Sequence, residues 1–287
     1  MGATPHEKTG RYAGASFALL TKHSKERAIA PRFQEALGAG VLVIDTFDTD
    51  TLGAFTREVP RVGSQMEAAR RKAEFAIELS GLPLGLGSEG SFGPGPFGFL
   101  PSNLEVIVMR DRDLGIEVAG VAVSPGHQAA GIFDGWERLE EFARSMLYPS
   151  HGLVLRPDGQ EDPRIFKDCG DFDSLREVFR ECAAMSREGL VFAESDLRAH
   201  RNPARMETIG EACEDLLRRI QRDCPGCSQP GFGLAKKIPG LPCAWCGAPT
   251  NAIRAEEFQC PACAFVEIRE SRDSAFGDPG QCPACNP

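Results

Sequence analysis

Short apolar runs alternate with amphipathic stretches along the first three quarters of the chain. Apolar runs at residues 15–20, 41–44, 84–86, 104–109, 116–123, 152–156 and 190–194 have the length of buried strands. Amphipathic stretches at residues 24–37, 64–80, 134–147, 173–187 and 202–222 have helical spacing. This alternation predicts an α/β domain over residues 11–222, with a mixed sheet flanked by helices. Residues 1–10 are polar and are expected to form a loose tail.

Local signals fix several helix boundaries. Ser64 and Glu67 have the spacing of a capping box, in which each side chain satisfies a free amide of the first turn. Gly81 should end that helix. Asn202 followed by Pro203 is a strong helix start, because asparagine caps well and proline needs no amide partner at the first position.

Two further segments carry weaker signals. Ser24 can cap the first helix, although Pro31 is expected to break or restart it. The apolar run at 84–86 is expected to be a short strand that enters a loop rich in glycine and proline at 87–101.

Cysteine spacing marks residues 223–287 as a separate, β-rich zinc module. Zinc prefers four thiolates in a tetrahedron, and a Cys-x-x-Cys turn (a knuckle) supplies two of them. Four knuckles favour two structural zinc ions over redox motifs or disulfides, because redox motifs do not occur in fours. In chain order the knuckles are Cys224/Cys227, Cys243/Cys246, Cys260/Cys263 and Cys282/Cys285. The remaining cysteines are expected to be packing residues: Cys169, Cys182 and Cys213.

The pairing of the four knuckles is open to argument. Residues 250–258 alternate without a turn signal, so an extended strand should hold the second and third knuckles apart. Glycine and proline between the first and second knuckles, and again between the third and fourth, let the chain double back. Sequential pairing, first with second and third with fourth, is therefore favoured. Nested pairing is the alternative.

Charge limits the partners of the chain. The net charge is -9, and the zinc module carries five basic against six acidic residues. Nucleic acid is therefore an unlikely partner, whereas a protein could dock on the zinc module. No apolar run approaches the roughly 20 residues of a membrane span, and no signal peptide is visible. Free Cys-x-x-Cys pairs then suggest the cytoplasm.

Three segments carry candidate chemistry, and two of them follow predicted strands. Thr21 to Lys25 opens a helix directly after the first strand, where helix amides and lysine favour a phosphate. The alternative is a solvated basic turn. Ser88, Glu89 and Ser91 lie between glycines after the strand at 84–86. A carboxylate there is placed to hold magnesium against phosphates. The alternative is a tight turn with a solvated glutamate.

The third segment runs from a strand into a helix start. If the strand continues, alternation places Glu194, Asp196, Arg198 and His200 on one face. Two acids, an arginine and a histidine on one face would suit a second metal or base site. A salt-bridged surface edge is the competing interpretation.

The order of these segments resembles the inosine/xanthosine triphosphatase (ITPase-like) families. The resemblance rests on Thr21-x-x-x-Lys25 after the first strand, on the helix around Lys72 and on the Gly-Ser-Glu-Gly segment around Glu89. It departs from those families at Lys22, where they have Asn, and at Ser91, where they have a second glycine. It implies an ITPase-like fold in which Glu89 holds magnesium. It further implies that Lys25 and Lys72 neutralise a triphosphate.

The chain as a whole resembles an uncharacterised bacterial family with a domain of unknown function. This second resemblance rests on the Ser-Glu-Gly-Ser-Phe-Gly-Pro stretch, on the Arg-Ala-His-x-Asn-Pro stretch and on the Cys-Asn-Pro ending. It implies no activity.

Two functions follow. The first is a magnesium-dependent hydrolase of nucleoside triphosphates with non-standard purine bases. The second is a non-enzymatic adaptor whose α/β domain binds an anion and whose zinc module docks a protein. The predicted catalytic residues are Glu89, Lys25, Glu194, Asp196 and His200. The predicted nucleotide- and magnesium-binding residues are Thr21, Lys25, Lys72, Ser88 and Ser91, together with Glu89 for the metal.

Overall fold

The computed structural model describes residues 10–45, 64–94, 101–271 and 274–286. The chain forms two compact units. The first comprises Met1–Arg110 and Ala119–Leu216, and the second comprises Asp111–Val118 and Leu217–Pro287. The predicted tail at residues 1–10 lies, apart from Gly10, outside the described residues.

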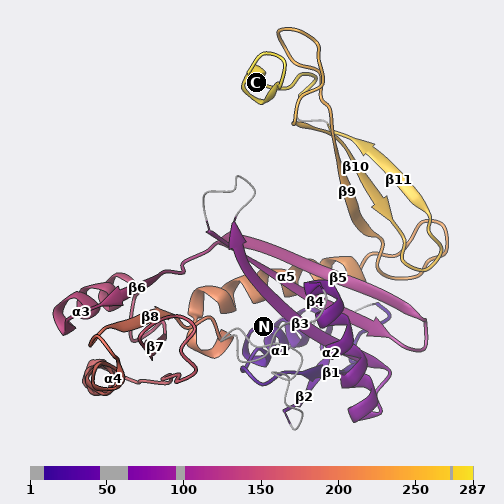
Figure 1. Ribbon diagram of the computed structural model, residues 1–287. Helices are drawn as coiled ribbons and strands as arrows, with labels where there is room; N and C mark the ends of the chain where they lie inside the picture. The colour runs from indigo at the N-terminus through magenta and orange to yellow at the C-terminus, as the bar shows by residue number, and fades with distance from the viewer. Residues whose placement is uncertain (1–9, 46–63, 95–100, 272–273, 287) are drawn as a thin grey trace, which may run out of the picture. The chain divides into compact units, whose positions relative to one another are not determined.

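The main sheet has five strands in the order β2-β1-β3-β4-β5 (Figure 1). In chain order they are β1 (Ser16–Leu20), β2 (Gly40–Ile44), β3 (Leu84–Pro94), β4 (Pro101–Asp111) and β5 (Ile116–Pro125). β1 pairs in parallel with both β2 and β3. β4 and β5 are joined by a tight turn and therefore run in opposite directions. The sheet is thus mixed, as predicted.

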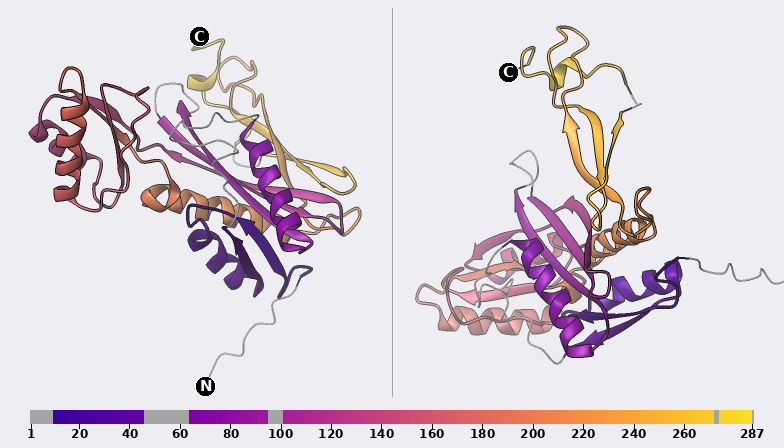
Figure 2. Two further views of the ribbon diagram at one scale, coloured as in Figure 1. Left: turned by 60° about the horizontal axis from the view of Figure 1, so that its bottom comes forward. Right: turned by 90° about the vertical axis from the view of Figure 1, so that its right-hand side faces the viewer.

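Helices cover both faces of this sheet (Figure 2). They are α1 (Glu26–Leu37), α2 (Gln65–Ser80) and α5 (Pro203–Ile220). Phe17 of β1 packs against Phe33 of α1, with ring centroids 4.8 Å apart. Its neighbour Ala18 packs against Ala76 of α2. Because successive strand residues point to opposite faces, α1 and α2 lie on opposite sides of β1.

α5 lies beside α1. The Sγ atom of Cys213 in α5 is 3.9 Å from the carbonyl oxygen of Ile29 in α1. α5 also approaches β5 closely, since a Cβ atom on Gly120 would clash with the carbonyl oxygen of Ala212. Cys213 is fully buried, as expected of a packing residue.

A second, smaller sheet lies in the same unit, where the sequence suggested a single one. β8 (Val191–Ser195) pairs antiparallel with β6 (Ala130–Phe133) and with β7 (Leu153–Pro157). Its core includes Cys169 and Cys182 and side chains of α3 (Trp136–Ser145) and α4 (Phe172–Met185). β8 is the central strand of this sheet, and the sequence analysis did not predict β6, an edge strand of only four residues.

The predicted helix boundaries are largely confirmed. Ser64 and Glu67 form the capping box of α2, and Gly81 ends that helix with φ 73°. The side-chain oxygen of Asn202 accepts the Arg205 amide at 3.0 Å, which caps α5. Each of these ends satisfies backbone groups that would otherwise lose their partners.

Two local predictions were wrong. Ser24 does not cap α1, because its φ of 56° places it in the left-handed region, and Lys25 occupies the cap position instead. Pro31 does not break the helix. Buried Ile29 and Phe33 flank it, and their packing outweighs the loss of one helical hydrogen bond.

The strand predicted at 84–86 is also longer than expected. β3 runs to Pro94, so Glu89 lies inside a strand and not in a loop. The glycines in β3 serve helix packing. A Cβ atom on Gly85 or Gly87 would clash with carbonyl oxygens of α2, at Ala73 and Ala69 respectively. Glycine therefore allows α2 to lie directly on the strand.

The second unit contains a three-stranded antiparallel sheet with the order β11-β10-β9. Its strands are β9 (Gly233–Pro239), β10 (Ile253–Gln259) and β11 (Val266–Glu270). β10 pairs along its length with both neighbours. The knuckles lie at the ends of these strands.

We predict that Gly87→Ala destabilises the first unit. The new methyl group would meet the Ala69 carbonyl, and overpacking of this kind typically costs ~1–3 kcal/mol. Gly40→Ala is the matched control, because Gly40 lies in the edge strand β2 with open space around its Cβ position. Urea unfolding should show the loss for Gly87→Ala alone. Equal stability of the two variants would contradict the close approach of α2.

Candidate functional site

The eight knuckle cysteines form two tetrads. One contains Cys224, Cys227, Cys260 and Cys263, and the other contains Cys243, Cys246, Cys282 and Cys285. In each tetrad the sulfur atoms all lie within 4.8 Å of one another.

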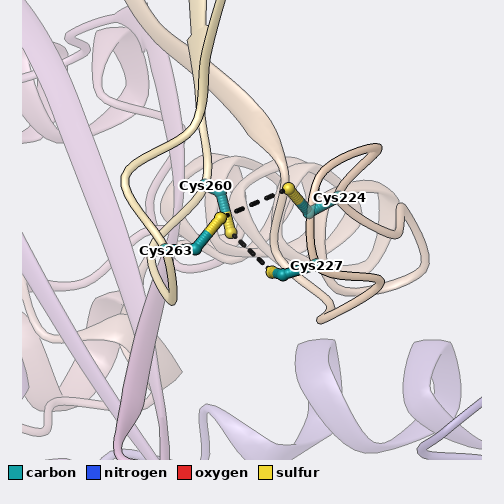
Figure 3. A group of neighbouring side chains, drawn as sticks. All are labelled: Cys224, Cys227, Cys260 and Cys263. Atoms are coloured by element: carbon teal, nitrogen blue, oxygen red, sulfur yellow. Dashed lines mark hydrogen bonds between the residues drawn. The ribbon is translucent and has the colours of Figure 1, made fainter.

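The sulfur spacing fits a tetrahedral zinc site. The closest contacts between knuckles are 3.8 Å and 3.7 Å in the first tetrad, drawn in Figure 3, and 3.9 Å and 3.7 Å in the second. Four sulfurs at the usual zinc–sulfur distance of about 2.3 Å would be about 3.8 Å apart. A disulfide would need about 2.05 Å. Each tetrad can therefore hold a zinc ion.

The pairing of the knuckles is interleaved, so the sequential prediction was wrong, and so was its nested alternative. The first knuckle pairs with the third, and the second pairs with the fourth. The reason is β9, which the sequence analysis took for a doubling-back segment. β9, β10 and β11 run antiparallel in succession, so alternate knuckles come to the same end of the sheet.

A shared turn shapes the knuckles. In each of them the carbonyl oxygen of the first cysteine accepts an amide four residues later, at 2.8 to 3.1 Å. In three knuckles that amide belongs to a residue with positive φ: Ser228, Gly247 and Ala264. A backbone amide also donates to the first sulfur in these three, for example from Gly226 to Cys224 at 3.3 Å.

These amides favour thiolates at Cys224 and Cys243. Burial alone raises the pKa of Cys224, but amides of Gly226 and Cys227, together with neighbouring thiols, outweigh it and lower that pKa to about 7. The pKa of Cys243 is likewise lowered to about 7, first by the amide of Cys246. Thiolates are the form that binds metal.

The first tetrad also has apolar support. Phe232 and Phe258 pack around Cys224 and Cys260 in a small core. Arg269 lies over the Phe258 ring at 4.2 Å. Together with the metal ligands, this cluster supplies the core of a module that has few other buried apolar side chains.

A second candidate site lies where β1 ends beside β3. β1 ends at Leu20 opposite Gly87, and β3 continues beyond it. The chain leaves β1 toward β2 through α1 and returns to β3 through α2 on the opposite face. In open α/β sheets, ligands bind at such a switch point, outside the carboxyl ends of the strands.

Predicted residues lie here on both faces of β3, because Ser88 and Glu89 are successive residues of that strand and point to opposite sides. The Lys25 ammonium donates to the Ser88 carbonyl oxygen at 3.0 Å and lies 3.2 Å from the Ser88 hydroxyl. The Lys72 ammonium of α2 binds a Glu89 carboxylate oxygen at 2.6 Å. All four side chains are buried. The Lys25 side chain lies beside the part of β3 that extends past the end of β1. The Glu89 side chain points toward Lys72 of α2.

Glu105 and Arg205 form a further buried pair near Lys25, and the sequence analysis missed both. The Arg205 guanidinium of α5 binds a carboxylate oxygen of Glu105 in β4 at 2.6 Å, and both side chains are fully buried. Gly90 makes room for the Glu105 carboxylate, since a Cβ atom there would clash with it. A glutamate on an otherwise apolar strand was the signal, because an acid rarely lies inside a core without a specific partner.

The cluster perturbs Lys25 strongly. Burial, together with the nearby Arg205 guanidinium, lowers the pKa of Lys25 from 10.5 to about 7, although Glu105 and Glu89 oppose the shift. Desolvation disfavours the charged ammonium and a neighbouring cation adds to the effect. Lys25 is therefore poised to take a negative partner, which would restore its charge.

The third predicted segment is only partly brought to this cluster. β8 ends at Ser195, so the alternation that would align Glu194 with His200 is broken. Glu194 lies 3.7 Å from Arg156 in the second sheet. Asp196 is buried and paired with Arg198 at 2.6 Å.

His200 is the member of that segment that comes close to the first one. Its ring stacks on His23 with centroids 5.3 Å apart. Burial, helped by Arg198, lowers the pKa of His200 and favours the neutral ring, while Asp196 opposes the shift.

The two remaining predicted residues have structural partners. The Thr21 amide donates to the Ile44 carbonyl oxygen at 3.1 Å, and its side chain is buried where β1 ends. The Ser91 hydroxyl donates to Gln65 at 3.0 Å. The Gln65 amide in turn donates to the carbonyl oxygens of Glu89 and Leu104, both at 2.8 Å, which ties β3 to β4.

Comparison with protein families gives one match. Residues 72–287, well over half of the chain, match the family described as "Domain of unknown function (DUF6671)". The chain belongs to the DUF6671 family. The DUF6671 match includes Lys72, Glu89, Glu105, Arg205 and all eight knuckle cysteines, whereas Lys25 precedes it.

Two other comparisons were negative. No curated protein and no solved structure matched the chain. Among the described residues of this DUF6671 protein, no helix is both long and apolar enough to cross a membrane.

We predict that zinc content reports the interleaved pairing. A variant with alanine at all four cysteines of the first and third knuckles should keep one zinc per chain, because the other tetrad stays whole. Alanines in the first and second knuckles should remove both ions. Metal analysis of folded protein distinguishes the cases, since sequential pairing reverses these two results.

We predict that the titration of Lys25 makes the free energy of unfolding depend on pH. Its pKa is about 7 when folded and about 10.5 when unfolded, so the unfolded chain binds more protons between these values. The free energy of unfolding should therefore rise from pH 7 to 9, by up to ~1.4 kcal/mol per pH unit, relative to a Lys25→Met variant. Urea unfolding of both proteins, loaded with zinc, measures the difference. Parallel pH profiles would count against the assignment.

Proposed function

We propose that this DUF6671 protein hydrolyses nucleoside triphosphates with magnesium, and that two structural zinc ions hold its second unit together. The observation that carries the proposal is that Lys25 binds Ser88 and Lys72 binds Glu89, at neighbouring positions of β3 beside the end of β1. The resemblance to the ITPase-like families supports triphosphates with non-standard purine bases as the substrate.

The two lysines at the switch point, Lys25 and Lys72, would bind the phosphate groups of the substrate. Lys25 lies at the start of α1, where helix amides and the ammonium both favour a phosphate. Phosphate there would replace the Ser88 hydroxyl as a partner of Lys25 and raise the pKa that burial has lowered. Lys72 is held by Glu89 and can shift toward a second phosphate group without losing its carboxylate.

The carboxylates fit a magnesium site only in part. Among the described residues, the groups of three or more metal-ligating side chains are the two cysteine tetrads, and Glu89 belongs to neither. Magnesium, however, often binds proteins through one or two carboxylates and takes further ligands from substrate phosphates and water. Glu89 would be such a ligand, and the bound ion would polarise the phosphate and the attacking water.

Glu105 would accept a hydrogen bond from the ligand or from a water molecule in the site. One of its carboxylate oxygens binds Arg205, and the other has no hydrogen bond within the described part of the chain. A buried acceptor without a partner costs ~1–3 kcal/mol, so it favours a donor supplied by water or by the ligand. The stacked His23 and His200 remain candidates for contact with the nucleotide.

The adaptor function stays the second candidate. Four thiolates leave no open position on zinc, so the tetrads suit structure and docking and not catalysis. An adaptor would bind an anion at Lys25 without turnover. Phosphate release separates the two functions.

We predict that Glu89→Gln lowers phosphate release from the best nucleotide substrate by about 10²-fold or more, because it removes the charge proposed to hold the metal. The amide keeps the shape of the side chain, so zinc content should stay at two per chain. Glu140→Gln is the matched control, since Glu140 is also salt-bridged but lies on α3. No phosphate release by wild type from any common or damaged nucleotide, with or without magnesium, would favour the adaptor.

A further inference from the structure

The four knuckles are internal copies of one turn, and one copy differs. Three read Cys-Pro-Gly-Cys or Cys-Pro-Ala-Cys, whereas the second reads Cys243-Ala244-Trp245-Cys246. The Trp245 amide donates to the Cys243 sulfur at 3.4 Å, as the amides of Gly226 and Ala262 do at equivalent positions. A small residue therefore satisfies the turn, and the indole serves another purpose.

The Trp245 side chain points into solvent. It is 80% exposed, the most exposed of the large hydrophobic side chains in the described part of the chain. Phe276 is 59% exposed in the bend just before Gly277, which pairs with the second knuckle. That pairing is fixed by a bridge between Cys243 and Gly277 and by a bond from the Ala244 amide to the Gly277 carbonyl oxygen at 3.1 Å.

The stretches of chain that contain the second tetrad carry no positive side chain. Residues 238–253 and 274–287, which contain the whole second tetrad, include no lysine or arginine and one acid, Asp278. Four thiolates around one zinc ion add two negative charges. An exposed aromatic ring in such a field attracts cations, because the ring face and the thiolates both favour positive charge.

We propose that the surface of the second tetrad, built on Trp245 and Phe276, docks a lysine- or arginine-bearing segment of a partner protein. A cationic side chain lies over the indole of Trp245, and apolar atoms of its stem or its neighbours cover Phe276. This inference does not depend on hydrolysis by the first unit. Nucleic acid is not the occupant, since the same charges repel phosphates.

The chain offers a clean reporter for the test. It has two tryptophans, so Trp136→Phe leaves Trp245 as the sole indole. Trp136 lies in α3, where its ring packs against Phe179 and its N–H donates to Glu140. Phenylalanine keeps an aromatic ring at that position. The probes are a ten-residue peptide of alternating lysine and alanine and its glutamate–alanine counterpart, added to the zinc-loaded full chain.

The lysine peptide should shift the emission of Trp245 to shorter wavelength and reduce its quenching by acrylamide, and the glutamate peptide should do neither. Affinity for a labelled lysine peptide should fall about five- to tenfold in Trp245→Ala. That variant should still bind two zinc ions, because the third and fourth knuckles carry alanine at the same position. Trp245→Phe should recover much of the affinity.

Three results would overturn the proposal. One is unchanged acrylamide quenching with the lysine peptide. The second is equal affinity of Trp245→Ala and wild type for that peptide, which would assign binding to the net charge of the chain alone. The third is equal binding of the glutamate peptide.

Discussion

The parallel pairing of β1 with β3 is the constraint on which the first unit depends. It places the turn that contains Lys25 beside Ser88, although 63 residues separate them in sequence. It also requires α2 to lie on β3, and glycines at 85 and 87 permit that approach. Once α2 lies there, its Lys72 reaches Glu89. The charged cluster is thus a consequence of how closely one helix and two strands can pack.

Burying these charged side chains costs desolvation free energy, and they differ in whether an opposite charge compensates that cost. Glu105 with Arg205 and Glu89 with Lys72 are matched pairs, whereas the Lys25 ammonium donates, within the described part of the chain, to two neutral oxygens of Ser88. An ammonium without a carboxylate loses more from desolvation than it gains from neutral partners, and its lowered pKa records that imbalance. Groups with pKa values perturbed in this way cluster at functional sites.

The second unit is stabilised in a different way. A three-stranded sheet with exposed outer strands buries too little apolar surface to fold by itself. Cysteine tetrads that can hold zinc lie at both of its ends and would compensate, and the first tetrad has an aromatic core as well. Interleaved pairing links each end of the sheet to two separate stretches of chain. Loss of either metal should therefore loosen strands and not merely a terminal loop.

The sequence by itself determined the local features of this protein. Capping at Ser64 and Asn202, the alternation of strands and helices, and the cysteines that bind metal all follow from short-range chemistry. Tertiary structure decided which of these features meet. The knuckle pairing depended on β9. Its lysines and glycine give no clear strand pattern in the sequence, and its pairing with β10 shows that it is a strand. Glu105 and Arg205 are likewise 100 residues apart in sequence. They pair because α5 brings Arg205 next to Glu105 of β4. Spacing in sequence reports what one turn can do, whereas contacts between distant segments depend on packing that no single segment encodes.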